Sequence, residues 1–356
     1  RIAAANLADQ PGQSIAGHVA RLRQGDRLAE LAVDGDPQAA VGTAFDCSYA
    51  TLDAGAQRLF RLLGLVPGPE VTPPGAAALV GMPVGQAARL LERLAGAHLL
   101  EPRAPGRFGF HDLLRRYAHQ RVHDEDGEPE RQSATSGLYS WYLHTADRAA
   151  GLLYPDRVRL PLPDTPAGLP VAEFDEPGGA LAWLDAERAN LVAAVRQAAE
   201  RGPRPPAWLL ADTLGGFFWH HRHLGDWIAV AHAGMRAAAD AGEPRVQAAA
   251  HRNLGMAQAC SGDYAQAADH FTDALALARQ AGWVDGQAAC LGDLAFVSSE
   301  LDRQEQARGE RPEDPFPISE AQLGEGVSRS GNGHTFEVAN LAAEGFDQHA
   351  ELELAA

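Results

Sequence analysis

Apolar residues recur every three or four positions along most of the chain, whereas the alternating pattern of a β-strand is nearly absent. The clearest amphipathic stretch is ALAWLDAERANLVAAVRQAAERG at residues 180–202. Only RAPGRFGF, at residues 103–110, combines breakers and aromatic residues in the manner of a β-hairpin. The pattern therefore predicts a mainly α protein with one small hairpin.

Residues 45–123 contain three amphipathic stretches in front of this hairpin. In the first, FDCSYATLDAGAQRLFRLLG, Asp53 is placed to cap a helix that faces inward with Leu59, Leu62 and Leu63. VTPPGAAALVGM, a short helix opened by prolines, and PVGQAARLLERLAGAHLL follow, and LLEP and FGF form the two strands. Three helices and a hairpin in this order predict a winged-helix domain over 45–123, with two or three further helices over residues 1–44.

A repeated pattern begins after the breaker-rich sequence RGPRPPAW. In HRNLGMAQACSGDYAQAADHFTDALALARQAG, small residues at Gly255 and Ala267 allow two antiparallel helices to approach closely, with Phe271 between them and Gly262-Asp263 at the turn. The same spacing of these residues recurs about forty residues later, and a weaker match to it precedes the clear repeat. The recurrences are Leu294-Ala295, Arg303 and Ala307 downstream, and Gly225-Asp226-Trp227 upstream. This pattern resembles the tetratricopeptide repeat and predicts an α-solenoid of helix pairs over residues 206–308.

The segments around the repeats have different compositions. Residues 124–205 are predicted to form a helical linker region, in which the charged stretch 124–136 is a linker and residues 157–179 are Pro-rich and extended. Residues 309–356 are acidic and Gly-rich and do not continue the repeat. We expect disorder or loose helix there; whether this tail is authentic or arises from a shifted reading frame stays open.

The charged residues exclude several classes of function. The formal net charge is -17, which argues against nucleic-acid binding by the whole chain, and all 30 basic residues are Arg. Without Lys the chain cannot contain a phosphate-binding loop of the GxxxxGK[ST] type.

The three cysteines, Cys47, Cys260 and Cys290, are far apart, as expected for inert thiols in a cytoplasmic protein. There is no secretory signal and no membrane-length apolar run, and the missing initial Met indicates a fragment.

Four local patterns together resemble one family of regulators. They are RIAAANLAD, FRLLGLVPGPEVTPPGAAALVGMP, FGFHDLLRRYA and ALAWLDAERANLVAAVRQA. The chain resembles the middle of actinobacterial antibiotic-pathway transcriptional regulators of the STAND type. Those proteins join a DNA-binding head, an NB-ARC nucleotide switch, a winged helix and tetratricopeptide repeats. The resemblance covers residues 1–308 and identifies residues 1–44 with the end of the NB-ARC region.

The resemblance implies a role for the junction between the hairpin and the next helix. FGFHDLLRRYA is similar to the family's MHD motif, with Phe110 in the Met position. By this resemblance His111 approaches the β-phosphate of ADP and locks the closed state, and Asp112 caps the following helix. The phosphate loop, the Walker B acid and the DNA-binding head are absent. We therefore expect no cofactor in this chain alone, and ADP or ATP only in a longer parent protein.

The expected partners follow from the same reasoning. The repeats are expected to bind a protein or peptide, the winged helix an NB-ARC core within the parent, and DNA is expected only through the missing head. The last exposed repeat face is expected to be apolar, which favours self-association. We expect no membrane partner.

Other chemical functions have weaker support in the sequence. His220 and His223 could share a helix face but lack a complete ligand set, so no metal site is predicted, and the remaining histidines are interpreted as structural. The basic cluster of Arg103, Arg107, Arg115, Arg116 and Arg121 leaves open a DNA-binding regulator that acts through its own winged helix. In a DNA-binding winged helix the third helix would be basic. Here the third helix carries only Arg89 and Arg93, and the negative charge of Glu92 offsets part of their positive charge. No nucleophile stands out, so an ATP-hydrolysing or other enzyme is disfavoured.

Overall fold

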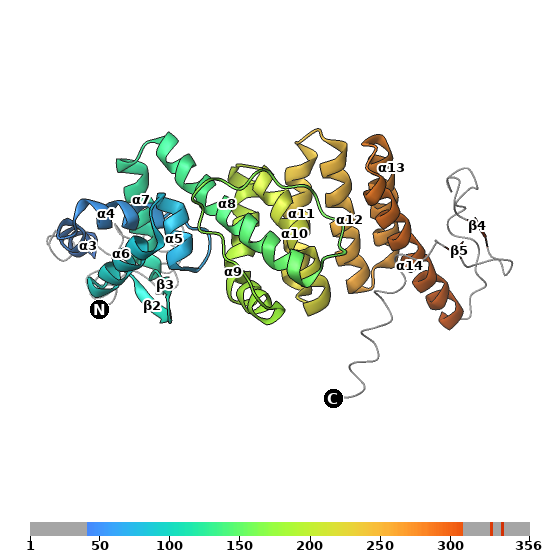
Figure 1. The fold of residues 1–356 in the computed structure, drawn as a ribbon, viewed down its shortest axis with the longest axis horizontal. Coiled ribbons are helices and arrows are strands. Elements are labelled where there is room, and N and C mark those ends of the chain that lie inside the picture. Colours follow the sequence, from blue (N-terminus) through green and yellow to red (C-terminus); the bar gives the residue numbers. More distant parts are fainter. Residues whose placement is uncertain (1–40, 309–327, 330–335, 338–356) are drawn as a thin grey trace, which may run out of the picture. The chain divides into compact units, whose positions relative to one another are not determined.

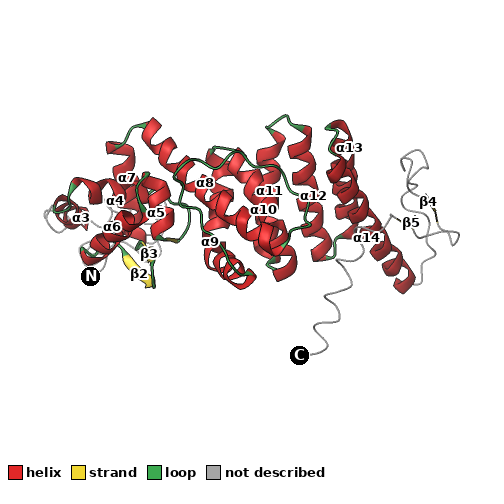
Figure 2. Cartoon of the chain, viewed as in Figure 1, coloured by secondary structure: helices red, strands yellow, loops and turns green. Residues whose placement is uncertain are grey.

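The computed structural model describes residues 41–308, 328–329 and 336–337. The chain divides into two compact units, one containing residues up to Pro155 together with Leu162–Leu210, the other containing Asp156–Pro161 and the residues from Ala211 on. The described residues are mainly helical, and Figure 2 shows that strands are few and short. This confirms the predicted mainly α fold class. The helices expected over residues 1–44 lie almost entirely outside the described residues.

The first unit begins with a winged helix. Its elements are α3 (Val41–Ala50), α4 (Ala54–Leu63), β1 (Glu70–Val71), α5 (Pro73–Val80), α6 (Val84–Gly96), β2 (Glu101–Ala104) and β3 (Arg107–Gly109). Asp53 caps α4 as predicted, by accepting a hydrogen bond from the backbone of Ala56 at 2.8 Å. The predicted hairpin is present, and β3 lies between β1 and β2 in an antiparallel sheet. Strand β1 was not predicted from the sequence.

Three longer helices complete the first unit. They are α7 (Asp112–Glu125), α8 (Glu128–Leu153) and α9 (Pro177–Arg201). Helix α7 packs against α4, and α8 packs against α5 and α9 (Figure 1). Gly137 permits this contact, since a Cβ there would lie 2.4 Å from the carbonyl oxygen of Ala78. Residues 124–155 and 162–205 thus belong to the same unit as the winged helix.

The charged stretch 124–136 is helical except at Asp126 and Gly127, so its interpretation as a linker was wrong. Asp126 is buried and forms an ion pair with Arg61, and its carbonyl oxygen accepts a hydrogen bond from Arg131 at 2.5 Å. The charges that suggested a solvated linker instead form the bend between α7 and α8.

The second unit contains paired helices. After α10 (Pro205–His221), which it shares with the first unit, come α11 (Leu224–Ala239), α12 (Pro244–Ser261), α13 (Tyr264–Gln280) and α14 (Val284–Arg308). Helices α11 to α14 pack consecutively, each against the next (Figure 1). The predicted close approach is present, because a Cβ on Gly255 would lie 2.8 Å from a ring carbon of Phe271. Gly262 has a left-handed conformation (φ 85°) and Asp263 caps α13, which confirms the predicted turn.

The two weaker recurrences predicted the wrong turns. Gly225-Asp226 lies within the first turn of α11, and the preceding turn is at Arg222-His223. Downstream, α14 continues through Arg303, where the frame predicted a turn. Asp302 occupies the position of Gly262 in that frame, so the residue that ends α12 is missing and the helix continues.

A short extended segment belongs to the second unit although both its flanks belong to the first. Within Asp156–Pro161, the backbone N–H of Leu160 donates to the buried carboxylate of Asp212 at 2.7 Å. A Cβ on Gly215 would lie 2.4 Å from Arg157 Nη2, so Gly215 leaves room for this guanidinium. Burial lowers the pKa of Arg157 to about 10. Buried polar contacts therefore fix a segment that the sequence indicated only as extended.

The acidic tail is described only at β4 (Ser328–Arg329) and β5 (Phe336–Glu337), which pair antiparallel. These four residues differ from the expected disorder or loose helix. The other residues of 309–356 lie outside the described part.

Candidate functional site

The MHD-like junction lies where β3 ends and α7 begins. His111 is extended (φ −67°, ψ 144°) and is the N-cap of α7, because its Nδ1 accepts a hydrogen bond from the backbone N–H of Leu113 at 3.4 Å. Asp112 is the first residue of the helix, so the expectation that Asp112 provides the cap was wrong. Its carboxylate still lies in the first turn, at the favourable end of the helix dipole.

The cap leaves one nitrogen of His111 available. When Nδ1 of a neutral imidazole accepts a hydrogen bond, the proton is on Nε2, which becomes a donor. His111 and Asp112 are both exposed, and Nε2 of His111 has no hydrogen-bond partner among the described residues. The junction therefore presents an N–H donor of the kind that a phosphate oxygen accepts.

Buried contacts fix the position of this junction. Phe110 is buried and meets the ring of Phe60 edge-on, with the centroids 5.5 Å apart. Arg115, one turn into α7, lies over the Phe110 ring at 5.9 Å. Its guanidinium donates to the carbonyl oxygens of Val66, Gly68 and Pro69 at 3.1, 2.8 and 3.0 Å. The aromatic residue in the Met position and this arginine thus attach the start of α7 to the α4–β1 connection.

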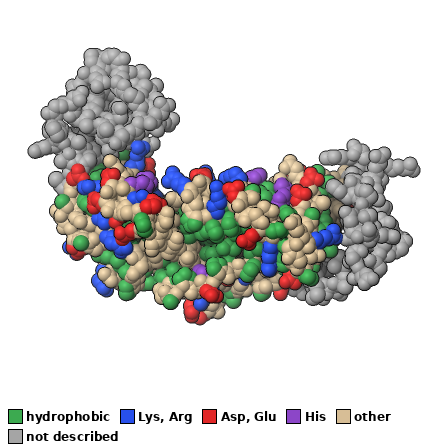
Figure 3. Space-filling view, turned by 90° about the horizontal axis from the view of Figure 1, so that it is seen from above, with side chains coloured by type: hydrophobic (Ala, Val, Ile, Leu, Met, Phe, Trp, Pro, Cys, Tyr) green, Lys and Arg blue, Asp and Glu red, His purple; other side chains and the backbone are tan. Residues whose placement is uncertain are grey.

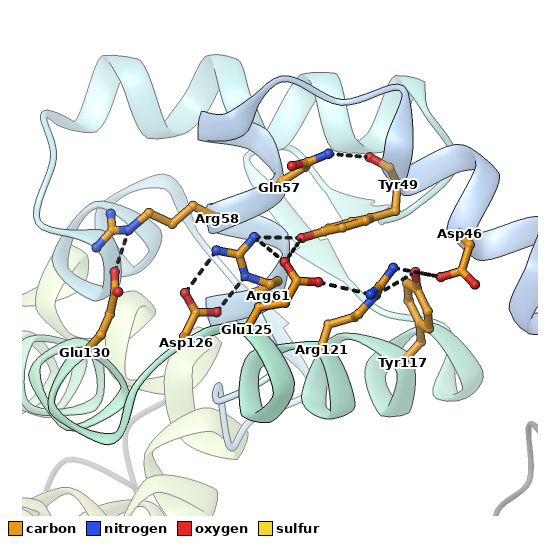
Figure 4. Close-up of polar contacts among 10 residues, drawn as sticks. All are labelled: Asp46, Tyr49, Gln57, Arg58, Arg61, Tyr117, Arg121, Glu125, Asp126 and Glu130. Carbon is orange, nitrogen blue, oxygen red and sulfur yellow. Dashed lines mark hydrogen bonds and ion pairs between the residues drawn. The ribbon is translucent and has the colours of Figure 1, made fainter.

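A polar network fixes the other end of α7 (Figure 4). Arg61 of α4 makes two hydrogen bonds to the buried carboxylate of Asp126, at 2.6 and 3.0 Å. Arg61 also donates to the hydroxyl of Tyr49 at 2.7 Å and pairs with Glu125 at 3.1 Å. The hydrogen bonds to Asp126 raise the pKa of Arg61 despite its burial. The guanidinium therefore stays charged and joins α3, α4 and the α7–α8 bend.

The network continues along α7 toward α3. The hydroxyl of Tyr117 donates to Asp46, and Arg121 pairs with Asp46 at 2.9 Å and with Glu125 at 3.1 Å. Burial raises the pKa of Tyr117, so this hydroxyl remains a donor at neutral pH. The two pairings with Asp46 were not predicted from the sequence, because their partners are 71 and 75 residues away.

The predicted basic cluster does not form one surface. Arg103 pairs with Glu101 at 2.9 Å, and Arg107 pairs with Glu70 and Glu187, each at 2.6 Å. In the third helix of the wing motif, Arg93 pairs with Asp53. Figure 3 shows basic and acidic side chains interspersed over one face of the described chain. Three members of the cluster thus pair with carboxylates, namely Arg103, Arg107 and Arg121, whereas Arg115 donates to backbone carbonyls.

Two members of the cluster line a cavity of about 720 Å³ between α7 and α9. Helix α7 contributes Arg115, Arg116 and His119, and α9 contributes Arg196 and Arg201. Glu200 is the one acidic residue in its lining, so the lining favours a negatively charged group. His111 and Asp112 do not line this cavity. The contribution of α9 was not predicted from the sequence.

The remaining candidates have structural environments. His220 and His223 do not share a helix face, because α10 ends at His221 and the chain turns at Arg222 (φ 55°). Burial raises the pKa of Cys290 to about 12 and also raises that of Cys260, as expected for inert thiols. Among the residues that the structure describes, no helix is long and apolar enough to cross a membrane.

Comparison with known proteins was made for the whole sequence. No family model matches the chain. Regulatory protein AfsR of Streptomyces coelicolor is 32% identical over 372 residues, which cover 99% of this chain and 36% of that protein. Regulatory protein AfsR of Streptomyces griseus is 34% identical over 284 residues, which cover 79% of this chain and 29% of the relative. The chain thus spans only about a third of the length of the curated relatives it matches.

One solved structure also matches, a STAND protein with a tetratricopeptide repeat sensor from Pyrococcus horikoshii. It is 12% identical and covers 86% of this chain and 58% of that chain, with a TM-score of 0.20. A TM-score this low does not indicate a shared arrangement of the whole chains. The AfsR similarity, which spans nearly the whole of this sequence, agrees with the expected resemblance to actinobacterial regulators and makes this chain a homologue of part of the Streptomyces AfsR proteins.

Proposed function

We propose that the winged helix and the repeats gate the nucleotide switch of a larger cytoplasmic transcriptional regulator. The winged helix packs on the switch in the closed state, and His111 donates a hydrogen bond to the β-phosphate of ADP. A signal received by the repeats shifts the population toward the open state. The chain itself carries out no chemical step, and it contacts DNA only through a separate head domain.

One observation supports this proposal above the others. His111 is exposed and held with its Nε2 directed away from the cap, at the start of a helix that is fixed at both ends. A hydrogen bond made at His111 is then coupled through α7 to the network around Arg61. A switch requires contacts that differ between two states, and we propose that the contact of His111 with ADP is made only in the closed state.

The experiment is a reporter assay with the full-length regulator that contains this segment. We expect His111→Ala to give transcription without the activating signal, because the closed state loses a contact that the open state lacks. His98→Asn is the matched control, since His98 is exposed, has a left-handed conformation (φ 59°) that Asn tolerates, and lies outside the junction. Signal-dependent transcription in the His111→Ala protein, as in the control, would count against the role.

The chain alone provides a second readout. The phosphate loop is absent from this sequence, so we expect calorimetry to detect no micromolar binding of ADP and no ATP hydrolysis. Micromolar binding by this chain would contradict the assignment of the nucleotide pocket to another part of the regulator.

The repeats are proposed to receive the signal by binding a protein or peptide. Helices α11 to α14 pack consecutively, and α14 is the last helix that the structure describes. Leu291 and Leu294 of α14 are only partly buried, which also supports weak self-association through this end of the unit.

A further inference from the structure

Two histidines and one aspartate converge between the paired helices of the second unit. His251 is on α12, and His270 and Asp273 are on α13, three residues apart and therefore on one face of that helix. Their possible ligand atoms all lie within 4.8 Å of one another. From this convergence we propose a zinc site formed by His251, His270 and Asp273, which ties α12 to α13.

The distances fit a shared ion. His251 Nδ1 lies 3.1 Å from His270 Nδ1 and 3.7 Å from the nearer carboxylate oxygen of Asp273. Two ligand atoms that each bind Zn²⁺ at about 2.0–2.2 Å with tetrahedral angles lie roughly 3.3–3.5 Å apart. Both measured distances are within a few tenths of an ångström of this range, so an ion requires only small side-chain rotations.

The chemistry of the side chains fits the same ion. Imidazole nitrogens with one carboxylate oxygen suit borderline divalent ions such as Zn²⁺, whereas Mg²⁺ prefers oxygen ligands only. Burial lowers the pKa of both His251 and His270, and the carboxylate of Asp273 opposes this shift in each. The neutral imidazole is the form of histidine that binds a metal. The carboxyl of Asp273 is exposed, which leaves a side of the site open for water as a fourth ligand.

The sequence interpretation regarded His251 as structural because no neighbour in the sequence completes a ligand set. The ligands come together only when α12 and α13 pair. The same 3.1 Å separation also fits a direct hydrogen bond between two neutral imidazoles, so the experiment must separate an ion from this bond.

The test is a zinc titration of the metal-free chain by calorimetry, with unfolding followed in parallel. We expect the wild-type chain to bind one more equivalent of Zn²⁺ than the double variant His251→Gln with His270→Gln. Zinc should raise the unfolding temperature of the wild type, and this shift should be lost in the double variant. Mg²⁺ should produce neither effect. Since the chain has 14 histidines, the difference between variants, rather than the total zinc bound, is the readout.

His98→Asn is the matched control. This variant should still bind the additional equivalent of Zn²⁺ and should still show the rise in unfolding temperature with zinc. Asp273→Asn, at an exposed position that does not threaten folding, should weaken zinc binding and keep the fold. Equal zinc stoichiometry in the wild type and in folded histidine variants would overturn the proposal and leave the direct hydrogen bond. The site stands on the geometry of α12 and α13 and does not depend on the proposed gating function.

Discussion

At the scale of single residues, the ion pair between Arg61 and Asp126 is largely buried, so we expect the first unit to be sensitive to the loss of one partner. The exposed fractions of the two side chains are 14% and 3%, so removing Arg61 leaves a buried carboxylate without its partner. We expect Arg61→Met to lower the free energy of unfolding by about 3 kcal/mol in a denaturant titration. Arg93→Met is the control, because its pair with Asp53 is about half exposed and should cost less than about 1 kcal/mol. Equal losses in the two variants would contradict this account of the network.

His144 gives a second prediction at this scale. It is buried on α8 with Nδ1 3.3 Å from the hydroxyl of Thr165, and burial lowers its pKa. Below about pH 6.5 the unfolded chain binds a proton here that the folded chain does not, so stability falls with acidification. His144→Gln should therefore make the free energy of unfolding less dependent on pH between about pH 7.5 and pH 5.5. An equal or steeper dependence in the variant would show that His144 is not the group responsible.

Contacts between residues that are close in the sequence could be predicted from it. Asp53 caps its helix by contacting a residue three positions away, and such a contact is visible in the sequence. The burial of Asp126 was not predictable, because its partner Arg61 is 65 residues away and a run of charges alone indicates solvent. The cap by His111 in place of Asp112 was missed for a different reason. Imidazole is a less common cap than carboxylate, although its Nδ1 can reach the second residue of the helix.

At the scale of elements, the pairing of α12 with α13 depends on the absence of a side chain at Gly255. An added Cβ would lie 2.8 Å from a ring carbon of Phe271 and 3.2 Å from the carbonyl oxygen of Ala267. Gly255→Ala gains up to about 1 kcal/mol of helix propensity but overpacks the interface at a cost of about 1–3 kcal/mol. We expect a net loss of about 1 kcal/mol in thermal or denaturant unfolding. Gly225→Ala, with open space around its Cβ, should be neutral or slightly stabilising, and the same sign in both variants would refute the close-packing argument.

The elements themselves were predictable where their pattern was long. The helical periodicity indicated α9 and α12, and the Gly-containing turn separated α12 from α13. Strand β1 has only two residues and forms by pairing with β3, which no local pattern reveals. The continuation of α14 shows the opposite error, since counting residues in a repeat frame predicts a turn even where no residue ends the helix.

At the scale of the whole molecule, the winged helix and the helices after it belong to one compact unit and the repeats to another. The sequence interpretation divided the chain after residue 123, at a charged stretch in which Asp126 is buried and paired with Arg61. The segment Asp156–Pro161 belongs to the repeat unit because Asp212 and Gly215 receive it there, and neither partner could be identified from composition. The proposed gating function assigns the ADP-contacting residue to the first unit and the signal-receiving surface to the second.

In the full-length regulator, His111 is proposed to hold ADP in the closed state. The most direct measurement is the ADP that remains bound to that regulator after purification, together with its rate of release, in the wild type, His111→Ala and His98→Asn. The account predicts less bound ADP and faster release for His111→Ala only, because a hydrogen bond to the β-phosphate is lost. Equal ADP content and equal release rates in all three proteins would contradict it.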